Sequence, residues 1–381
     1  MEEKVLVVGG GIGGLVLARA LARRGVAVDV VERAPALRAV GAGITLGANA
    51  MRALGSVGLG EAVAARGLAM RAGAVAARDG TPLSTTRFDA LAPRYGEAYA
   101  IHRGALHEAL AEGLPSEVQV RCDTTVTALT DGGAEGVEVR LSTGASARYR
   151  AVVGADGLRS TVRTLAFGPN EPVYAGYTCW RWTGRVAGGP VGMVEQWGRG
   201  ARVGLVPLAG GDVYAFFVAD APRGTPADPA QARAEHVRAR FADFGGDVPR
   251  VLAALRDDEP LLHHDIEEVE QSPWCRGAVA LLGDAAHAMT PNFGQGAAMA
   301  IEDAVVLARE LVAHRDAPSA LRAYEARRRP RVEEIQRGAR RFGAVGQWRS
   351  PVAAWARDLA MRWTPEATTQ RALERIVSYD P

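Results

Sequence analysis

Val5-Leu-Val-Val-Gly9-Gly-Gly11-Ile-Gly13-Gly14, close to the start of the chain, joins an apolar run directly to a cluster of glycines. The apolar run predicts a strand buried on both faces, and residues 15–24 after the glycines predict a helix. Residues 26–31 predict a second strand, which ends at Glu32. Glycines in the pattern G-x-G-x-x-G between a strand and a helix, with an acid at the end of the next strand, are typical of a dinucleotide-binding βαβ unit.

The glycines of this pattern have different physical tasks. Gly9 permits the tight turn after the strand, Gly11 lets the backbone approach a pyrophosphate, and Gly14 lets the helix pack on the strand. The carboxylate of Glu32 can accept hydrogen bonds from a ribose diol, and it would repel a 2′-phosphate. We therefore expect the first part of the chain to bind a dinucleotide.

A second strand–turn–helix lies near the other end, where Val279-Ala-Leu-Leu-Gly-Asp284 is followed by Pro291 and by Gly294-Gln295-Gly296. The first amides of the predicted helix have no intrahelical partner and lie at the positive end of its dipole, which favours a partial negative charge. These features suit a cofactor with a polyol and an electron-rich ring; alternatively, the glycines serve only tight packing in an α/β core. The apolar face that this helix is predicted to bury consists of Ile301, Ala304, Val305, Ala308, Leu311 and Val312.

Charged residues stand at two further strand–helix junctions. Gly154-Ala-Asp156-Gly157 follows a predicted strand at residues 149–153 and leads into a helix. Asp156 is either a contact to a cofactor or dinucleotide or the N-cap of that helix, and its likeness to Gly283-Asp284 favours the contact. Arg103 starts a helix after a short strand, where it can reach a phosphate or a ring carbonyl or can simply be solvated.

Between these blocks, residues 172–272 change in character. Short runs of alternating or aromatic residues predict an antiparallel sheet, and residues 73–88 predict a hairpin around Asp79-Gly80. This region is the candidate substrate domain, in which Arg202 and Tyr214 fall on neighbouring predicted strands. Its aromatic residues belong either to the core or to a pocket, and they are Trp180, Trp182, Trp197, Tyr214, Phe216 and Phe217.

Composition excludes several classes of function. The chain has 381 residues, of which 48% are apolar and 23% are charged, as in a globular protein with room for two domains. Its net charge of +2 predicts no strong attraction to nucleic acid, and the arginines of residues 321–341 alternate with glutamates as on a solvated helix face. Lys4 is the only lysine, which excludes most lysine chemistry.

The three cysteines, Cys122, Cys179 and Cys275, are widely spaced and form no C-x-x-C pair, so neither a disulfide framework nor a zinc site is predicted. The first residues lack the layout of a signal peptide, and no uncharged apolar run approaches the roughly 20 residues of a membrane span. We therefore expect a cytoplasmic protein that has no metal and no nucleic-acid or membrane partner.

Three blocks together, the glycine pattern with Glu32-Arg33, residues 154–163 and residues 283–303, resemble the FAD-dependent aromatic hydroxylases, the single-component monooxygenases of the p-hydroxybenzoate hydroxylase type. The resemblance runs from residue 4 to about residue 340. It implies an α/β fold, with a Rossmann-like FAD-binding domain, an inserted and mostly antiparallel β-sheet substrate domain, and a C-terminal helical segment.

The expected domains follow from this resemblance and from the changes in composition. The discontinuous FAD-binding domain is expected at residues 1–72, 99–171 and 273–345. The substrate domain is expected at residues 73–98 and 172–272, and the C-terminal helices at residues 346–381.

The resemblance also implies three groups of cofactor contacts. The pyrophosphate and adenosine contacts are Gly9, Gly11, Gly13, Gly14, Glu32 and Arg33. The contacts to the rest of FAD outside the ring are Arg103, the backbone at Val126, Asp156 and Asp284. The residues facing the flavin ring are Gly294, Gln295, Gly296, Ala297 and Ala298.

The implied activity is hydroxylation of a small aromatic or heteroaromatic substrate with NAD(P)H and O2, through a C4a-hydroperoxyflavin. FAD is expected to be bound tightly without a covalent bond, and NAD(P)H to visit transiently as a co-substrate. Because the chemistry belongs to the flavin, no catalytic side chain is assigned. The candidate substrate-pocket residues are Arg202, Tyr214 and Cys179, and the protein is expected to be a monomer or a homodimer.

Within the family, residues 174–180 and the spacing of Arg202 and Tyr214 resemble the salicylate and urate hydroxylase branch. Cys179 stands where urate hydroxylases have an amide, which argues against urate and favours a phenolic or heteroaromatic substrate. Flavin halogenases are disfavoured because Thr183-Gly184 replaces their isoleucine-proline. The alternatives are an FAD-dependent epoxidase or reductase acting on an unsaturated substrate and a non-catalytic flavin-binding regulatory protein.

Overall fold

A six-stranded sheet forms the first half of the molecule. The computed structural model describes residues 4–37, 41–189, 191–224, 233–257, 261–271 and 273–381. The sheet has the order β18 (Cys275–Arg276), β19 (Val279–Leu281), β12 (Ala151–Gly154), β1 (Val5–Val8), β2 (Val28–Val31) and β8 (Val118–Arg121). All its pairings are parallel except that of β18 with β19. β1 therefore lies in the middle and is buried throughout, as its unbroken apolar run predicts.

Long helices pack on this sheet. Helix α1 (Ile12–Ala22) follows the glycine turn directly and packs against α10 (Gly296–Ala313), the helix that begins at the second glycine stretch. The face predicted for α10 is buried except for Val312, which lies in the last turn and is 49% exposed. The other elements of this half are β3 (Gly43–Leu46), α2 (Ala48–Ser56), α3 (Gly60–Ala64), β4 (Leu68–Ala69), α4 (Ala92–Tyr95), β7 (Tyr99–His102), α5 (Arg103–Ala111), β9 (Val126–Asp131), β10 (Val137–Leu141), β11 (Ser146–Tyr149), α6 (Thr161–Phe167) and α9 (Asp284–His287).

A seven-stranded sheet forms the second half. Its order is β17 (Leu262–Glu268), β13 (Val173–Arg185), β16 (Asp212–Asp220), β15 (Ala201–Pro207), β14 (Val194–Trp197), β5 (Ala72–Ala77) and β6 (Pro82–Arg87). The predicted hairpin at residues 73–88 is β5–β6, and it joins this sheet through a parallel pairing of β5 with β14. Helices α7 (Arg233–Arg240) and α8 (Val248–Ala254) supply residues to the apolar core on one face. The predicted class, α/β with a mostly antiparallel inserted sheet, is confirmed; the domain boundaries stay a prediction.

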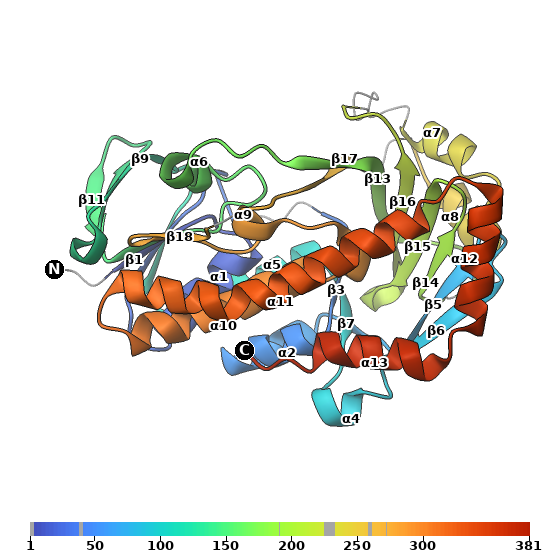
Figure 1. Cartoon of the computed structure of the whole chain (residues 1–381), viewed down its shortest axis with the longest axis horizontal. Coiled ribbons are helices and arrows are strands. Elements are labelled where there is room, and N and C mark those ends of the chain that lie inside the picture. The colour runs from blue at the N-terminus through green and yellow to red at the C-terminus, as the bar shows by residue number, and fades with distance from the viewer. Residues whose placement is uncertain (1–3, 38–40, 190, 225–232, 258–260, 272) are drawn as a thin grey trace.

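The C-terminal helices connect the two halves (Figure 1). Helix α11 (Ala317–Gly346) runs across the molecule from the six-stranded sheet to the seven-stranded sheet. Helix α12 (Pro351–Trp363) packs on β6, and α13 (Glu366–Val377) packs on both β6 and α2. The C terminus consequently lies beside α2, far along the sequence but close in space. Within the described ranges, no helix combines the length and apolar character needed to cross a membrane.

Candidate active site

A cavity of about 770 Å³ lies between the two sheets. It gathers the sequence blocks that were predicted to form a site, although they are separated by hundreds of positions. The predicted site residues that line it are Gly11, Gly13, Arg103, Cys179, Arg202, Tyr214, Asp284, Gly294, Gln295, Gly296 and Ala297.

The glycine turn after β1 is closely packed at Gly9 and Gly14 but open at Gly11. Gly9 has a φ of +113°, and a Cβ placed on it would lie 2.4 Å from the carbonyl oxygen of Ala155. A Cβ on Gly14 would lie 2.0 Å from the carbonyl oxygen of Gly9, so both positions require glycine for packing. A Cβ on Gly11 would meet nothing within 4 Å. Gly11 therefore leaves the first amides of α1 accessible from the cavity.

The predicted adenosine contacts lie at the end of β2. The two oxygens of Glu32 accept hydrogen bonds from the backbone amides of Gly10, at 2.7 Å, and Ala34, at 2.9 Å. These bonds hold the carboxylate beside the glycine turn. Arg33 is exposed, and Val126 is buried at the start of β9. Glu32 thus stabilises the glycine turn in which Gly11 leaves space beside the backbone.

Asp156 is occupied by local hydrogen bonds. Its Oδ2 accepts from the backbone amides of Thr161, at 2.7 Å, and Val162, at 3.1 Å, at the start of α6. Loss of solvation raises the pKa of its carboxyl, against the effect of these bonds. Ala155 and Gly157, on either side of it, line the cavity. The N-cap of α6 is Ser160, so Asp156 stabilises the start of this helix without being its N-cap, and a cofactor contact by Asp156 stays a prediction.

The start of α10 forms the opposite side of the cavity. Gly294 has a left-handed backbone (φ +61°), and a Cβ on Gly296 would meet nothing within 4 Å. The side chain of Gln295 is buried, and its Oε1 accepts a 3.1 Å hydrogen bond from Asn49 Nδ2. Ala297 lines the cavity, whereas Ala298 is fully buried in the packing of the helix.

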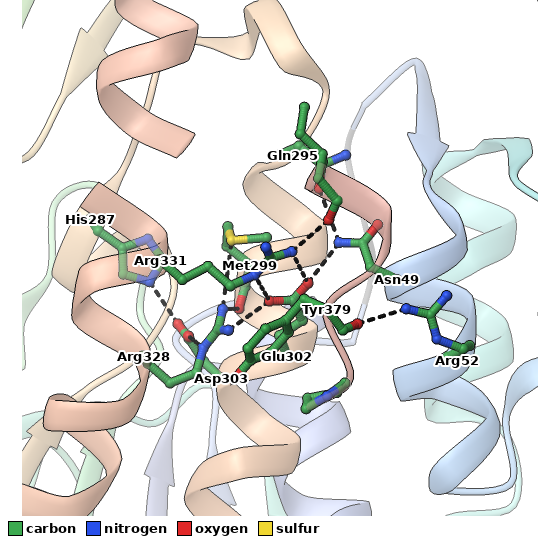
Figure 2. A network of polar contacts seen from close by, with 12 residues as sticks. Asn49, Arg52, His287, Gln295, Met299, Glu302, Asp303, Arg328, Arg331 and Tyr379 are labelled. Carbon is green, nitrogen blue, oxygen red and sulfur yellow. Dashed lines mark hydrogen bonds and ion pairs between the residues drawn. The ribbon is translucent and has the colours of Figure 1, made fainter. Parts of the chain in front are cut away.

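A buried network of charges supports this helix start (Figure 2). Glu302 and Asp303 of α10 form ion pairs with Arg328 of α11, at 2.6 Å and 2.7 Å, and none of the three is exposed. His287 Nε2 lies 2.6 Å from Asp303. Burial disfavours the charged form of Asp303, but His287 and Arg328 outweigh it and lower its pKa to about 2. The prediction that the arginines of residues 321–341 all lie on a solvated face is therefore wrong for Arg328, which pairs with two buried acids, and for Arg331, which is 13% exposed and also pairs with Glu302.

The substrate-pocket candidates occupy different parts of the cavity. Arg202 is 2% exposed and is held by Glu195, at 2.9 Å, and by Gln347, at 3.0 Å. Cys179 is buried, and loss of solvation raises the pKa of its thiol to about 11. Tyr214 lies over β3, where a Cβ on Gly43 would come within 2.5 Å of it, and loss of solvation raises the pKa of its hydroxyl. At neutral pH both groups are uncharged.

The aromatic residues of the seven-stranded sheet divide between core and cavity. Tyr214 and Phe216 line the cavity. The other four are buried in the core, and they are Trp180, Trp182, Trp197 and Phe217. Both interpretations of the aromatic pattern were thus correct for different members, because alternate residues of a strand point to opposite faces.

One side of the cavity was not predicted. Residues from the two last helices close it, and we call them the C-terminal wall: Met361, Thr369, Ala372, Leu373, Ile376 and Val377. Leu373, Ile376 and Val377 have the spacing of one helix face, which indicates that α13 buries this face but not what it covers. Arg331 donates to the carbonyl oxygen of Ile376, at 2.8 Å, and Arg52 to that of Val377, at 2.6 Å. These two arginines connect the wall to the rest of the protein.

Comparisons with known proteins agree with this geometry. The sequence model of a family described as "FAD binding domain" matches residues 2–339. The chain is 38% identical over 386 residues to an aurachin C monooxygenase/isomerase from Stigmatella aurantiaca, covering 99% of this chain and 98% of that protein. It is 36% identical over 380 residues to a 2-heptyl-3-hydroxy-4(1H)-quinolone synthase from Pseudomonas aeruginosa, with 98% and 97% covered. The crystal structure of Klebsiella pneumoniae HpxO complexed with FAD and uric acid superimposes with a TM-score of 0.90 at 30% identity, covering 99% of this chain and 97% of that one.

Proposed function

The chain belongs to the FAD-dependent aromatic monooxygenases, and from this premise we propose that its substrate is a 4(1H)-quinolone-type ring that carries an aliphatic chain. The protein is an FAD-dependent hydroxylase of small aromatic compounds that uses NAD(P)H and O2. The single observation that carries the proposal is the C-terminal wall, which gives the cavity an apolar side away from the glycine turn.

The residues present fit FAD. Two glycine-opened helix starts face one cavity, at Gly11 and at Gly296, and neither has a neighbour where a Cβ would be. Their free amides and positive dipole ends suit the pyrophosphate and the electron-rich ring. Arg103 and Asp284 line the cavity between them, where a ribityl chain would need polar partners.

In this proposal the residues predicted from the sequence hold the cofactor in place. Gly9, Gly11, Gly13 and Gly14 would form the turn that holds the pyrophosphate, with Glu32 stabilising that turn, and Gly294 to Ala297 would face the ring. Bound FAD supplies the acceptance of a hydride from NAD(P)H and the activation of O2. The start of α10 stabilises negative charge near the ring, because its amides and dipole are already oriented when that charge develops.

The apolar side chains of the wall favour a substrate that carries an aliphatic chain. Leu373 and Ile376 of α13 face the cavity together with Met361 of α12, and Phe88 and Met193 line it from the seven-stranded sheet side. An aliphatic chain placed among such residues gains about 25 cal/mol for each Å² removed from water. The 2-heptyl-3-hydroxy-4(1H)-quinolone in the name of one relative has a chain of this kind.

The polar groups in the cavity fit a purine less well. Arg202 is already engaged by Glu195 and Gln347, and Cys179 offers only a neutral thiol, which is a weak hydrogen-bond donor. A purine such as urate requires several strong donors and acceptors, and leaving them unpaired would cost binding free energy. The cavity therefore supports an apolar heteroaromatic substrate over urate.

The test compares four candidate substrates, of which the two quinolones differ only in the heptyl chain. Purified holoenzyme is mixed with 2-heptyl-4(1H)-quinolone, with unsubstituted 4(1H)-quinolone, with salicylate and with urate, and NAD(P)H oxidation is recorded while mass spectrometry detects the addition of one oxygen. We expect the heptyl compound to have the highest kcat/KM and full coupling. A higher kcat/KM for urate or salicylate than for the heptyl compound would refute the proposal.

Location and assembly are part of the same proposal. Cys122, Cys179 and Cys275 are free thiols, which supports a reducing compartment such as the cytoplasm. The enzyme is proposed to act as a monomer or a homodimer, and its molar mass in solution by light scattering decides between the two.

A further inference from the structure

Arg181 is a cavity residue to which the sequence assigned no role. It lies on β13, four positions before the end of that strand, and its side chain lines the cavity near Tyr214. Its Nη2 is 3.1 Å from His264 Nδ1, while its Nε is buried without a hydrogen-bond partner. No carboxylate forms an ion pair with Arg181 in the part of the chain that the structure describes. This guanidinium thus faces the cavity without a compensating charge.

The charges around Arg181 are also positive. Loss of solvation lowers the pKa of His264. The positive charges of Arg181, Arg233 and Arg103 lower this pKa further. Arg103 lines the same cavity, and Asp284 is the acid that acts on it there. Like charges gathered in a partly desolvated hollow create a positive potential that attracts an anion.

Two anions could use this position, a phosphate of NAD(P)H or a carboxylate of the substrate. The phosphate is favoured because the side of the cavity proposed for the substrate is apolar, whereas Arg181 is only partly buried. A partly buried guanidinium can bind a charged group without desolvating it fully, which suits a dinucleotide that binds and leaves in every turnover. The chain has one complete G-x-G-x-x-G, so a second dinucleotide needs contacts of another kind.

We propose that Arg181, with His264 beside it, is an anion-binding subsite that receives a phosphate group of NAD(P)H while its nicotinamide meets the flavin. This inference rests on the proposed function, because it assigns a step of the same reaction. It adds a binding residue on β13, outside the three glycine-containing blocks that carry the resemblance to the family.

The experiment separates charge recognition from hydride transfer. The variants are Arg181→Gln, Arg181→Lys and, as a matched control, Arg185→Gln, on the same strand and face of the sheet but outside the cavity, where Arg185 pairs with Asp212. The Kd of NAD+ and NADP+ for each oxidised holoenzyme is measured by calorimetry. Flavin reduction is then followed anaerobically with NAD(P)H and with 1-benzyl-1,4-dihydronicotinamide, which carries no phosphate.

We expect Arg181→Gln to weaken binding of the dinucleotide about tenfold or more, because the variant loses a charge-assisted hydrogen bond to the phosphate. The limiting rate of reduction by NAD(P)H, the rate with the benzyl compound and the Kd of FAD should stay unchanged. Arg181→Lys should keep most of the affinity, and Arg185→Gln should match the unmodified protein.

Three results would overturn the inference. The first is an unchanged Kd for the dinucleotide in Arg181→Gln. The second is an equal loss with the benzyl compound, which would indicate a distorted flavin site. The third is a loss of affinity for the aromatic substrate instead, which would assign Arg181 to a substrate carboxylate. The benzyl compound carries no phosphate, so it can reduce the flavin whether or not the Arg181 subsite exists. The preference for the heptyl quinolone can therefore be tested independently, with the benzyl compound as the reductant.

Discussion

Asn49 donates a 2.6 Å hydrogen bond to Glu302 in the interior of the protein, although the two residues are 253 positions apart. The Glu302 carboxylate only accepts hydrogen bonds, so the NH2 group of Asn49 must face it. The same NH2 group donates to Gln295 Oε1, which leaves the NH2 group of Gln295 directed away from Asn49. Asn49 therefore sets the orientation of a side chain that lines the proposed flavin site.

Asn49→Ala should reduce both the stability of the protein and its affinity for FAD. The substitution leaves the buried Gln295 carbonyl without a donor, at a cost of about 1–3 kcal/mol in the free energy of unfolding. It also frees Gln295 to rotate, which should raise the Kd of FAD. Urea unfolding of the apoprotein and fluorescence titration with FAD measure the two effects. Asn170→Ala, at an amide that bonds Gln271 outside the cavity, is the control; equal Kd values for FAD in the two variants would disprove the role of Asn49.

Arg328 and Arg327 are neighbours on α11, but their substitutions should lower the free energy of unfolding by very different amounts. Arg328 is fully buried between Glu302 and Asp303, whereas Arg327 is 45% exposed and lies 3.7 Å from Glu310. Removing one partner from a buried ion pair costs about 3–5 kcal/mol, because it leaves a buried charge uncompensated. An exposed pair contributes about 0–1 kcal/mol. In urea unfolding, Arg328→Ala should lose several times more free energy than Arg327→Ala; similar losses would contradict the burial of the network.

Local features of the site could be predicted from the sequence, whereas long-range ones could not. A Cβ on Gly14 is blocked by Gly9, five positions away, so this contact belongs to the glycine pattern itself, whereas a Cβ on Gly9 is blocked by Ala155, which directly follows the adjacent strand β12. The start of α10 can also be recognised from the local sequence, since Gly294 and Gly296 are two positions apart at the beginning of this helix.

The C-terminal wall and the burial of Arg328 depend on which surfaces meet in space. The apolar spacing of α13 indicates that one face is buried, but the sequence does not indicate that this face closes a cavity beside α2. Likewise, the arginines of α11 follow one charge pattern, and only the packing of α11 on α10 distinguishes Arg328 from its solvated neighbours.

Stability should fall at low pH through Asp303. Its pKa is about 2 in the folded protein, compared with about 3.9 for an unperturbed aspartate. A depressed pKa stabilises the folded state above the unfolded value, and this contribution is lost as the pH falls from about 4 toward about 2. The contribution is on the order of 2 kcal/mol. Unfolding of the apoprotein at pH 5 and pH 3 measures about half of it, because the loss continues to about pH 2. Asp303→Asn should be less stable at pH 5 and should lose less between the two values; an equal loss in both proteins would exclude Asp303 as the cause.

Leu373 of the C-terminal wall should contribute to substrate choice. Leu373→Ala removes apolar surface that lines the cavity, and one lost methylene contact in an apolar site is worth about 1–3 kcal/mol. We expect kcat/KM for 2-heptyl-4(1H)-quinolone to fall about tenfold or more, while the value for unsubstituted 4(1H)-quinolone, which lacks the aliphatic chain, stays within about twofold. Leu359→Ala is the matched control, because Leu359 is 40% exposed on α12 and does not line the cavity. If Leu373→Ala lowers kcat/KM for both quinolones equally, the wall acts on the ring or on folding, and the aliphatic chain must bind elsewhere.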